Sequence, residues 1–457
     1  MKVSFYTLGC KVNQYETQMM RERFERAGYE TTSEEEKADI CIINTCTVTN
    51  LSDRKSRQRI RRVRDRNENA VIVVAGCYAQ TNSEAAASIP GVSIVVGTNE
   101  KSRIVEFVEE FLEKNGGHAA AGKTDMHVLS YGQLTEYEES GIIHYMDSRT
   151  RAYIKIQDGC DRFCSYCIIP YARGHVRSRH PDEIVREARE LLTRGFREIV
   201  LTGINTALYG IDLSEEELSS YGSGLHGVET AVAAVSRLNG DFRIRLSSLE
   251  PNVIDEDTAR RLNRYPKLCP HMHLSLQSGS DTVLSRMNRR YDMETYRRIV
   301  RIFRERDPNF AVTTDIIAGF PGETEEEFEE SLRAVREIGF CRVHAFRYSR
   351  RSGTEADRME RQIGGETKNE RVNALIREGE RSAEAFFRGN IGTVRRVLFE
   401  RYHSDTSVLA GLTDNYIPVY CHMKQEEAES LINRFGDVKL EKLYQDGMSG
   451  KIAGNIR

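Results

Sequence analysis

The sequence predicts an α/β fold in three parts, and three observations support it. Four short apolar runs alternate with amphipathic helical patterns in the first third of the chain, at residues 3–7, 39–44, 70–75 and 93–97. Six further strand-then-helix units follow between residues 152 and 348, and short β runs separated by turn residues begin at residue 392. Strands that alternate with helices indicate parallel sheets covered by helices. We therefore expect a parallel α/β domain, a partial (βα)6 barrel and a small OB-like β-barrel.

The bulk composition is that of a globular protein without a strong charge bias. The 457 residues are enough for two to four domains at about 100–200 residues each. Lys and Arg number 66 against 69 Asp and Glu, so the whole chain does not resemble a nucleic-acid binder, although a local basic patch is compatible with this balance. Ten cysteines without an export signal or a membrane-length apolar run predict a cytoplasmic protein with metal or redox chemistry rather than disulfides.

Three cysteines follow the first predicted strand of the barrel in one short loop. Cys160, Cys164 and Cys167 are spaced C-x3-C-x2-C after the strand at 152–157. A structural zinc site needs four ligands, and no fourth Cys or His follows at a suitable spacing. Three thiolates suit three corners of a [4Fe-4S] cluster with the fourth iron left open. The alternative is a set of buried or zinc-bound cysteines.

Three other cysteines each come just after a predicted strand of the first domain. Cys10, Cys46 and Cys77 follow the first, second and third of these strands. Because the carboxyl ends of parallel strands meet at one edge of a sheet, we expect these thiols to converge. A second three-thiolate cluster and ordinary buried thiols both fit this spacing. Cys41 lies inside its strand, which indicates core packing.

These motifs resemble those of a known family. The C-x3-C-x2-C loop, with Tyr166 before its last cysteine, is similar to the signature of the radical S-adenosylmethionine (radical SAM) superfamily. The residues around Cys10, Cys46 and Cys77, which read LGCKVN, NTCTV and AGCYAQ, resemble the methylthiotransferase family, and the likeness extends over essentially the whole chain. The resemblance implies two [4Fe-4S] clusters, one on each triad, and S-adenosylmethionine on the open iron. It also implies four segments: a methylthiotransferase domain at 1–115, a linker at 116–145, a radical SAM domain at 146–388 and an RNA-binding TRAM domain at 389–457.

The resemblance implies that the ends of the barrel strands hold the cofactor. The candidate residues, with Tyr166 of the cysteine loop, are Gly203, Glu250, Gln277 and Ile317. A glycine permits close backbone approach, and a carboxylate accepts hydrogen bonds from ribose hydroxyls. The alternatives are an exposed loop acid at Glu250, a helix cap at Gln277 and simple loop geometry around Ile317.

The resemblance also implies the reaction, in which a methylthio group replaces a hydrogen. Residues 8–16 look most like the branch that modifies C2 of N6-threonylcarbamoyladenosine, 3′ of the tRNA anticodon. Sister branches act on isopentenyladenosine in tRNA and on an aspartate of a ribosomal protein. A hypothesis of another class is a non-catalytic iron–sulfur protein that binds RNA. The implied partners are the tRNA anticodon stem-loop, an electron donor such as flavodoxin or ferredoxin, and a sulfur source.

Arginines are the expected readers of the substrate. Threonylcarbamoyladenosine ends in a carboxylate, which the planar fork of a guanidinium binds in a bidentate manner. Four arginines near predicted strand ends are candidates for this role: Arg173, Arg177, Arg347 and Arg350.

Two features predict RNA contacts less directly. The helix expected at 51–66 carries eight basic residues between positions 54 and 66 and is either a solvated face or a phosphate-contacting surface. In the terminal β-barrel, basic and acidic residues are equal in number. Tyr402 and Tyr416 there are either base-stacking residues or part of the barrel core.

Overall fold

The computed structural model describes residues 1–116, 124–138, 141–146 and 150–456, and these form two compact units. The first unit contains Met1–Tyr145, Gln157–Arg179 and Ser349–Asp357, and the second contains Met146–Ile156, His180–Tyr348 and Arg358–Arg457. The cysteine loop thus groups with the amino-terminal sheet. The four domain limits given above stay a prediction. Among the described residues, no helix combines the length and the apolar character that crossing a membrane requires.

A six-stranded parallel sheet forms the centre of the first unit, in the order β2-β1-β3-β4-β5-β6. Its strands are β1 Lys2–Thr7, β2 Glu30–Thr32, β3 Ile40–Thr45, β4 Val71–Gly76, β5 Val92–Val96 and β6 Asp125–His127. The four longer strands confirm the predicted runs to within one residue. The three-residue strands β2 and β6 were not predicted. Strand β6 falls in the segment expected to be a linker, of which 117–123 and 139–140 lie outside the described residues.

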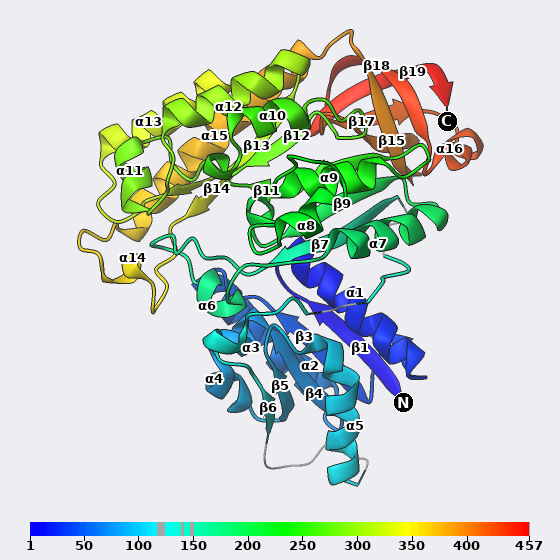
Figure 1. Cartoon of the computed structure of the whole chain (residues 1–457), viewed down its shortest axis with the longest axis vertical. Helices are drawn as coiled ribbons and strands as arrows, with labels where there is room; N and C mark the ends of the chain where they lie inside the picture. The colour runs from blue at the N-terminus through cyan, green and yellow to red at the C-terminus, as the bar shows by residue number, and fades with distance from the viewer. Residues whose placement is uncertain (117–123, 139–140, 147–149, 457) are drawn as a thin grey trace. The chain divides into compact units, whose positions relative to one another are not determined.

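Helices cover both faces of this sheet (Figure 1). The helices are α1 Lys11–Arg26, α2 Asn50–Arg66, α3 Cys77–Thr81, α4 Ser83–Ala87, η1 Lys101–Arg103, α5 Ile104–Lys114, η2 Tyr131–Gln133 and α6 Ile169–Arg173. Successive side chains of a strand point to opposite faces. Phe5 packs edge-on against Phe24 of α1, whereas Tyr6 joins the apolar cluster that contains Ile60 and Val63 of α2. The amphipathic patterns in the sequence therefore correspond to helices packed on the two faces.

The second unit contains the barrel strands. They are β7 Arg151–Asp158, whose last two residues belong to the first unit, β9 Glu198–Gly203, β10 Arg243–Leu246, β11 Ser248–Leu249, β12 His271–Leu274, β13 Ala311–Ala318 and β14 Arg342–Arg347. They form two sheets, ordered β10-β9-β7-β8 and β11-β12-β13-β14. The short strand β8 Arg177–Ser178 pairs antiparallel with the end of β7 inside the first unit. All six predicted strands are present, and the partial parallel barrel is confirmed.

The helices of the second unit follow these strands in turn. They are α7 Pro181–Thr193, η3 Thr206–Leu208, α8 Glu215–Ser219, α9 Val228–Ser236, η4 Pro251–Val253, α10 Glu256–Leu262, α11 Asp281–Arg286, α12 Met293–Arg306, α13 Glu325–Ile338, α14 Glu355–Arg358, which begins in the first unit, and α15 Gly365–Gly389. The pattern of residues 280–305 predicts a single helix, and this prediction is wrong, because α11 and α12 replace it. Asn288 between them has φ of 57°, a left-handed conformation that a right-handed helix does not continue through. Asp292 then caps α12 by accepting a hydrogen bond from the Thr295 backbone N–H.

The chain ends in a closed five-stranded barrel, in the order β15-β16-β17-β19-β18. Its elements are β15 Val394–His403, β16 Val408–Thr413, β17 Pro418–His422, α16 Gln425–Leu431, β18 Phe435–Tyr444 and β19 Gly447–Ile456. The predicted small β-barrel is confirmed. Tyr402 packs against the core of this barrel, and the Tyr416 ring stacks on His271 at 4.2 Å between centroids. Both rings therefore have structural roles.

Candidate active site

The cysteine loop between β7 and α6 depends on a glycine for its shape. Gly159 has φ of 73°, and a Cβ there would lie 1.7 Å from the carbonyl oxygen of His175. Only glycine permits so close an approach. The loop is then fixed by backbone hydrogen bonds from Cys160 N–H to the Gly174 carbonyl (3.0 Å) and from Cys167 N–H to the Cys164 carbonyl (2.9 Å). All three cysteine side chains, and that of Tyr166, stay partly exposed, as ligands of an added group need to be.

The structure brings the amino-terminal cysteines together at the carboxyl edge of the six-stranded sheet. Cys10 follows β1, Cys46 follows β3 and Cys77 begins α3 directly after β4. A Cβ on Gly9 would lie 2.8 Å from Cys46 Cβ, so the two cysteine-bearing turns are in close contact. Burial outweighs the lowering by Arg173 and Lys101 and, with smaller contributions from the neighbouring Cys46 and Cys10, raises the pKa of Cys77 to about 11. The predicted convergence of this triad is therefore a feature of the fold.

The Arg173 side chain from α6 joins the two cysteine-bearing parts of the first unit. Its Nε donates to Cys77 Sγ at 3.2 Å, and its Nη2 donates to Asn13 Oδ1 at 2.7 Å. Its Nη1 donates to Glu16 and also lies 3.3 Å from Asp158 Oδ2. Burial by itself lowers the pKa of Arg173, but these anionic neighbours raise it well above its usual value. A permanent positive charge is thus held against Cys77.

The buried charges around Arg173 provide a test of whether an iron–sulfur cluster fits here. The cations Arg173, Arg177 and Lys101 are paired with two carboxylates, Glu16 and Asp158, and all five side chains are buried. Of these cations, Arg173 also donates to Cys77 Sγ at 3.2 Å. A buried cation beside Cys77 suits the thiolate that would hold a cluster better than a neutral thiol. Among the described residues, no three His, Cys, Asp or Glu side chains are placed to hold a single metal ion. The donor set that fits a cluster is the three thiols that follow β1, β3 and β4, with the Arg173 guanidinium beside Cys77.

The cofactor candidates of the second unit share the carboxyl edge of the barrel. Gly203 ends β9, Glu250 follows β11, Gln277 follows β12 and Ile317 is the second-last residue of β13. The Ile317 N–H donates to the Gln277 carbonyl at 2.8 Å. Gln277 has φ of 68°, a conformation that is costly for a residue with a side chain and is often found at functional sites. These residues occupy the positions at which barrel enzymes bind ligands.

Glu250 is buried rather than an exposed loop acid. Its carboxylate accepts a hydrogen bond from Asn205 Nδ2 at 3.0 Å and lies 3.3 Å from Arg289 Nη1. The fold therefore fixes this carboxylate, and a ribose hydroxyl would meet a preorganised acceptor.

The four candidate arginines divide into two pairs. Arg173 and Arg177 are buried, and Arg177 donates to Asn99 Oδ1 and to the Arg173 carbonyl, both at 2.6 Å. Arg347 and Arg350 are exposed. Arg347 donates to Asn369 Oδ1 at 2.6 Å, and Arg350 donates to Asp357 Oδ1 at 2.6 Å. Arg173, Arg177 and Arg350 belong to the first unit and Arg347 to the second. Of the four, only Arg347 and Arg350 present guanidinium groups to solvent.

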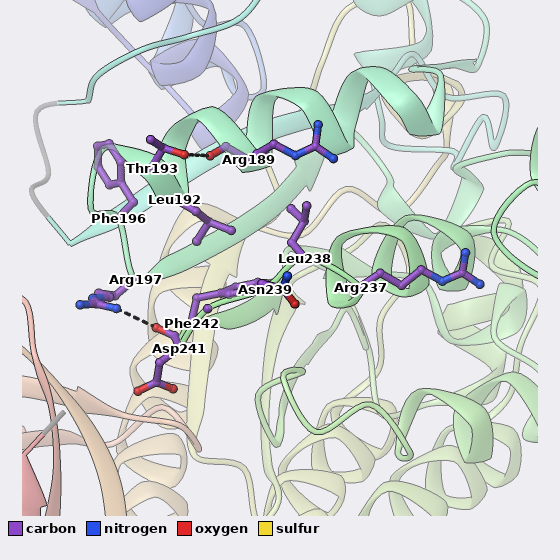
Figure 2. A pocket seen from close by; sticks show the side chains of 11 residues that line it. Arg189, Leu192, Thr193, Phe196, Arg197, Arg237, Leu238, Asn239, Asp241 and Phe242 are labelled. Atoms are coloured by element: carbon purple, nitrogen blue, oxygen red, sulfur yellow. Dashed lines mark hydrogen bonds between the residues drawn. The ribbon is translucent and has the colours of Figure 1, made fainter.

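The pocket in Figure 2 lies at the opposite end of the barrel strands. Its lining includes Phe196 and Arg197 before β9 and Asp241 and Phe242 before β10, around a volume of about 460 Å³. Figure 2 shows the Arg197 guanidinium, bonded to the Asp241 carbonyl at 3.2 Å, extending to one side and Arg237 to the other. The side chains do not converge on a common point, and we assign this pocket no part in the site.

Sequence reasoning did not identify Glu16, Lys101, Asp158 or the His273–Asp315 pair. Glu16 and Lys101 lie on helices and resemble ordinary surface residues in sequence. For Asp158 a signal was present, because this residue directly precedes Gly159 of the cysteine loop. His273 Nε2 lies 3.3 Å from Asp315 Oδ2 near the carboxyl end of β12. Successive residues of a barrel strand face inward and outward in turn. The neighbours Met272, Leu274 and Ile316 belong to the hydrophobic core, so this alternation could have placed His273 and Asp315 on the inner face of the barrel.

Two compact units, a parallel barrel and two cysteine triads describe a class of radical enzyme, and comparisons with known proteins agree. The sequence matches the Radical SAM superfamily over residues 154–335 and the family described as Uncharacterized protein family UPF0004 over residues 2–97. A solved structure, the radical S-adenosylmethionine methyltransferase TsrM from Kitasatospora setae, is similar with a TM-score of 0.54 and 16% identity, covering 78% of this chain and 76% of that one. At that identity, the likeness concerns the fold alone.

Curated relatives match almost the whole length. Threonylcarbamoyladenosine tRNA methylthiotransferase MtaB of Bacillus subtilis (strain 168) is 41% identical, covering 97% of this chain and 95% of its own length. The tRNA-2-methylthio-N(6)-dimethylallyladenosine synthase of Clostridium tetani (strain Massachusetts / E88) is 32% identical, with the same two coverages of 97% and 95%. The chain belongs to the radical SAM methylthiotransferase family.

Proposed function

We propose that this protein inserts a methylthio group at C2 of N6-threonylcarbamoyladenosine in tRNA, next to the anticodon. The observation that carries the proposal is the arrangement of six cysteines in two triads within one compact unit, with Arg173 reaching from the segment of one triad to Cys77 of the other. The name of the Bacillus subtilis relative supports the choice of substrate. A role in tRNA modification would place the protein in the cytoplasm.

Each group of residues has a defined part in this proposal. Cys160, Cys164 and Cys167 would hold the cluster that binds S-adenosylmethionine, and Cys10, Cys46 and Cys77 would hold the second cluster. When bound, these groups supply the reductive cleavage of S-adenosylmethionine and the sulfur that is transferred. Gly203, Glu250, Gln277 and Ile317 would orient the cofactor at the carboxyl edge of the barrel. An external electron donor, such as flavodoxin or ferredoxin, and a sulfur source would complete the reaction.

Substrate reading falls to the exposed arginines in this proposal. Arg347 is at the end of β14, and within the described part of the chain its guanidinium has one hydrogen-bond partner, the side-chain amide of Asn369. It can therefore turn to a carboxylate without leaving an acid unpaired. Arg350 would have to give up Asp357 first. Because an adenine stacked in the anticodon loop hides its C2 hydrogen, the base should be splayed out for the reaction.

The test compares two tRNA substrates on anaerobically reconstituted protein. We expect mass spectrometry of nucleosides to show methylthiolation of tRNA carrying threonylcarbamoyladenosine and none of tRNA carrying isopentenyladenosine. Reaction on the isopentenyl substrate alone would refute the substrate and leave the reaction class standing.

The triad assignments are tested with matched triple variants. With Cys160, Cys164 and Cys167 all changed to Ala, cleavage of S-adenosylmethionine should be lost. With Cys10, Cys46 and Cys77 all changed to Ala, cleavage should persist, about half the iron should be lost and no product should form. Normal cleavage by the first variant would contradict the catalytic assignment and favour a non-catalytic iron–sulfur protein.

A further inference from the structure

We propose that the exposed crest of helix α2 binds the phosphate backbone of the RNA substrate. The crest consists of Arg54, Lys55, Arg61 and Arg62. This inference rests on the proposed function, because it names a surface through which the same substrate is held. Helix α2 belongs to the first unit, as do both cysteine triads.

The side chains of α2 divide into a buried stripe, two tethered flanks and this crest. Ser56, Ile60 and Val63 are buried against the sheet. On the flanks, the Arg59 guanidinium lies 3.1 Å from Glu34, and Arg64 pairs with Asp65. The four crest residues are exposed, and among the described residues no acidic side chain pairs with them. Four positive charges therefore remain uncompensated on one side of a single helix.

The crest differs from other arginine-rich helices of the chain. Helix α12 also carries several arginines, but three of them meet acids: Arg297 lies 2.9 Å from Glu337, Arg298 lies 2.9 Å from Glu256 and Arg301 lies 3.1 Å from Glu294. The net charge of the chain is −3, so an unpaired basic face is a local exception. Such a face attracts a polyanion, while a paired face does not.

The chemistry of the crest favours RNA over a membrane or an acidic protein. Three of its four residues are arginines, whose planar fork matches phosphate oxygens. A membrane-binding helix would also need a broad exposed apolar face, but on α2 Ile60 and Val63 are buried in the core and only Leu51, in the first turn, is exposed. Regularly placed charges along a helix suit a regular anionic backbone.

The fold also fixes where this surface points. Arg351 donates to Asp53 Oδ2 at 2.6 Å and to Asn50 Oδ1 at 2.9 Å, which anchors the first turn of α2. The Ser56 hydroxyl donates to the Cys46 carbonyl at 3.0 Å, which ties the helix to a cluster cysteine. RNA held on the crest would therefore lie on the helix that directly follows the Cys46 turn. In contrast, the terminal barrel has balanced charge, and its Tyr402 and Tyr416 rings are packed.

The experiment measures tRNA affinity against salt concentration for two matched triple variants of the full-length, reconstituted protein. The first is Arg54→Gln/Arg61→Gln/Arg62→Gln on α2, and the control is Arg297→Gln/Arg298→Gln/Arg301→Gln on α12. Each phosphate contact contributes about 0.7–0.9 to the slope of log K against log salt. We expect the α2 variant to lose about 2–3 from that slope and to bind roughly 10- to 100-fold more weakly near 0.1 M salt. The control should match the wild type.

Additional variants and ligands test the folding, the charge and the specificity of the crest separately. Iron content and thermal unfolding check that the α2 variant is folded, and Arg54→Lys/Arg61→Lys/Arg62→Lys keeps the charge and should keep the slope. If the folded Gln variant binds tRNA with unchanged affinity and unchanged salt slope, the inference is overturned. Polyglutamate, an acidic polypeptide, serves as the competing ligand: a Gln variant that loses binding to polyglutamate but not to tRNA would also overturn it. If the wild type modifies threonylcarbamoyladenosine while the Gln variant binds normally, only the crest assignment fails. If the wild type modifies no tRNA, the proposed function fails instead.

Discussion

Two buried charge networks, one in each unit, have similar composition and different surroundings. In the first unit, the three cations Arg173, Arg177 and Lys101 meet two carboxylates, Glu16 and Asp158. In the second unit, Arg151, Arg243 and Arg245 surround the buried Glu198, and Arg151 also meets Glu400. Both networks contain more positive than negative charge. The two networks differ in the groups, other than these carboxylates, that accept hydrogen bonds from the arginines.

In the second unit, backbone carbonyls of the terminal barrel accept these hydrogen bonds. Arg243 Nη1 donates to the Leu412 carbonyl at 3.1 Å, and Arg245 Nη2 donates to the Thr413 carbonyl at 3.4 Å. In the first unit, Arg177 donates to Asn99 Oδ1 and to the Arg173 carbonyl, whereas Arg173 donates to Asn13 Oδ1 and to the sulfur of Cys77. The comparison indicates that the Glu198 network joins barrel strands to the terminal barrel, whereas the Arg173 network also holds a cation against a cysteine.

The largest effect should come from Glu198→Ala. This change leaves three buried arginines around an empty position, and removing one partner of a buried ion network costs about 3–5 kcal/mol. Urea unfolding measures the loss, and folded protein should still assemble both clusters. A change in the free energy of unfolding below about 1 kcal/mol would contradict a structural role for this network.

The next largest effect should come from Arg173→Gln. Two carboxylates lose their guanidinium, and we expect a loss of about 3 kcal/mol in stability. The distinguishing result is the reduction potential of the amino-terminal cluster, which should become more negative because a positive charge and an N–H donor to Cys77 are lost. This reduction potential is measured by potentiometric titration followed by electron paramagnetic resonance. Cys160, Cys164 and Cys167 are changed to Ala in all samples, so that only the amino-terminal cluster gives a signal.

Arg173→Lys serves as the companion variant. Lysine keeps the positive charge but lacks the planar guanidinium group. The reduction potential of the amino-terminal cluster in this variant should therefore lie between those of Arg173→Gln and the parent protein. An unchanged potential in both variants would show that Arg173 acts on folding alone.

These networks also show what the sequence could and could not predict. Cys10, Cys46 and Cys77 were predicted to meet because strand ends of a parallel sheet share an edge, and periodicity located those strands to within one residue. No local pattern distinguishes the buried Glu16 and Lys101 from exposed residues on similar helices, since their burial depends on contacts between distant segments. For the same reason, Arg173 was predicted to face the substrate, although its side chain turns inward to Cys77. The break at Asn288 between α11 and α12 is likewise a backbone conformation without a glycine or proline to mark it.

A smaller effect concerns how the stability contributed by the Glu198 network depends on pH. Burial alone raises the pKa of Glu198, but Arg243, Arg245 and Arg151 outweigh it and leave the pKa well below its usual value. A carboxyl group with a lowered pKa in the folded state stabilises the protein above its unfolded-state pKa of about 4.3, and this stability is lost as the pH falls. We expect Glu198 to account for a loss of about 2 kcal/mol between pH 7 and pH 3.

This prediction is checked by urea unfolding at both pH values. Glu198→Gln should be less stable at pH 7 and should show a shallower decline toward pH 3 than the parent protein. Equal declines in the two proteins would mean that other carboxylates account for acid sensitivity.

The smallest effect should come from an exposed pair of the same chemistry. On α15, Arg388 pairs with Glu384 at 2.6 Å, with 60% and 51% of the two side chains exposed. An exposed pair one helical turn apart contributes about 0.3–0.5 kcal/mol. Glu384→Gln should therefore change the free energy of unfolding by less than about 0.5 kcal/mol, and a larger loss would show that burial is not what separates these interactions.

The interleaving of the two units along the chain limits how this protein can be divided or recombined. Strand β7 begins in one unit and ends in the other, and Gln157–Arg179 belongs with the amino-terminal sheet. A fragment that stops at residue 145 would retain Glu16 and Lys101 but lose Arg173, the cation that completes their network. Chimaeras between relatives joined at that point would pair Arg173 of one parent with Glu16 and Cys77 of the other. Exchanges that transfer residues 1–145 together with 157–179 and 349–357 should therefore yield folded, cluster-bearing hybrids far more often than a single crossover.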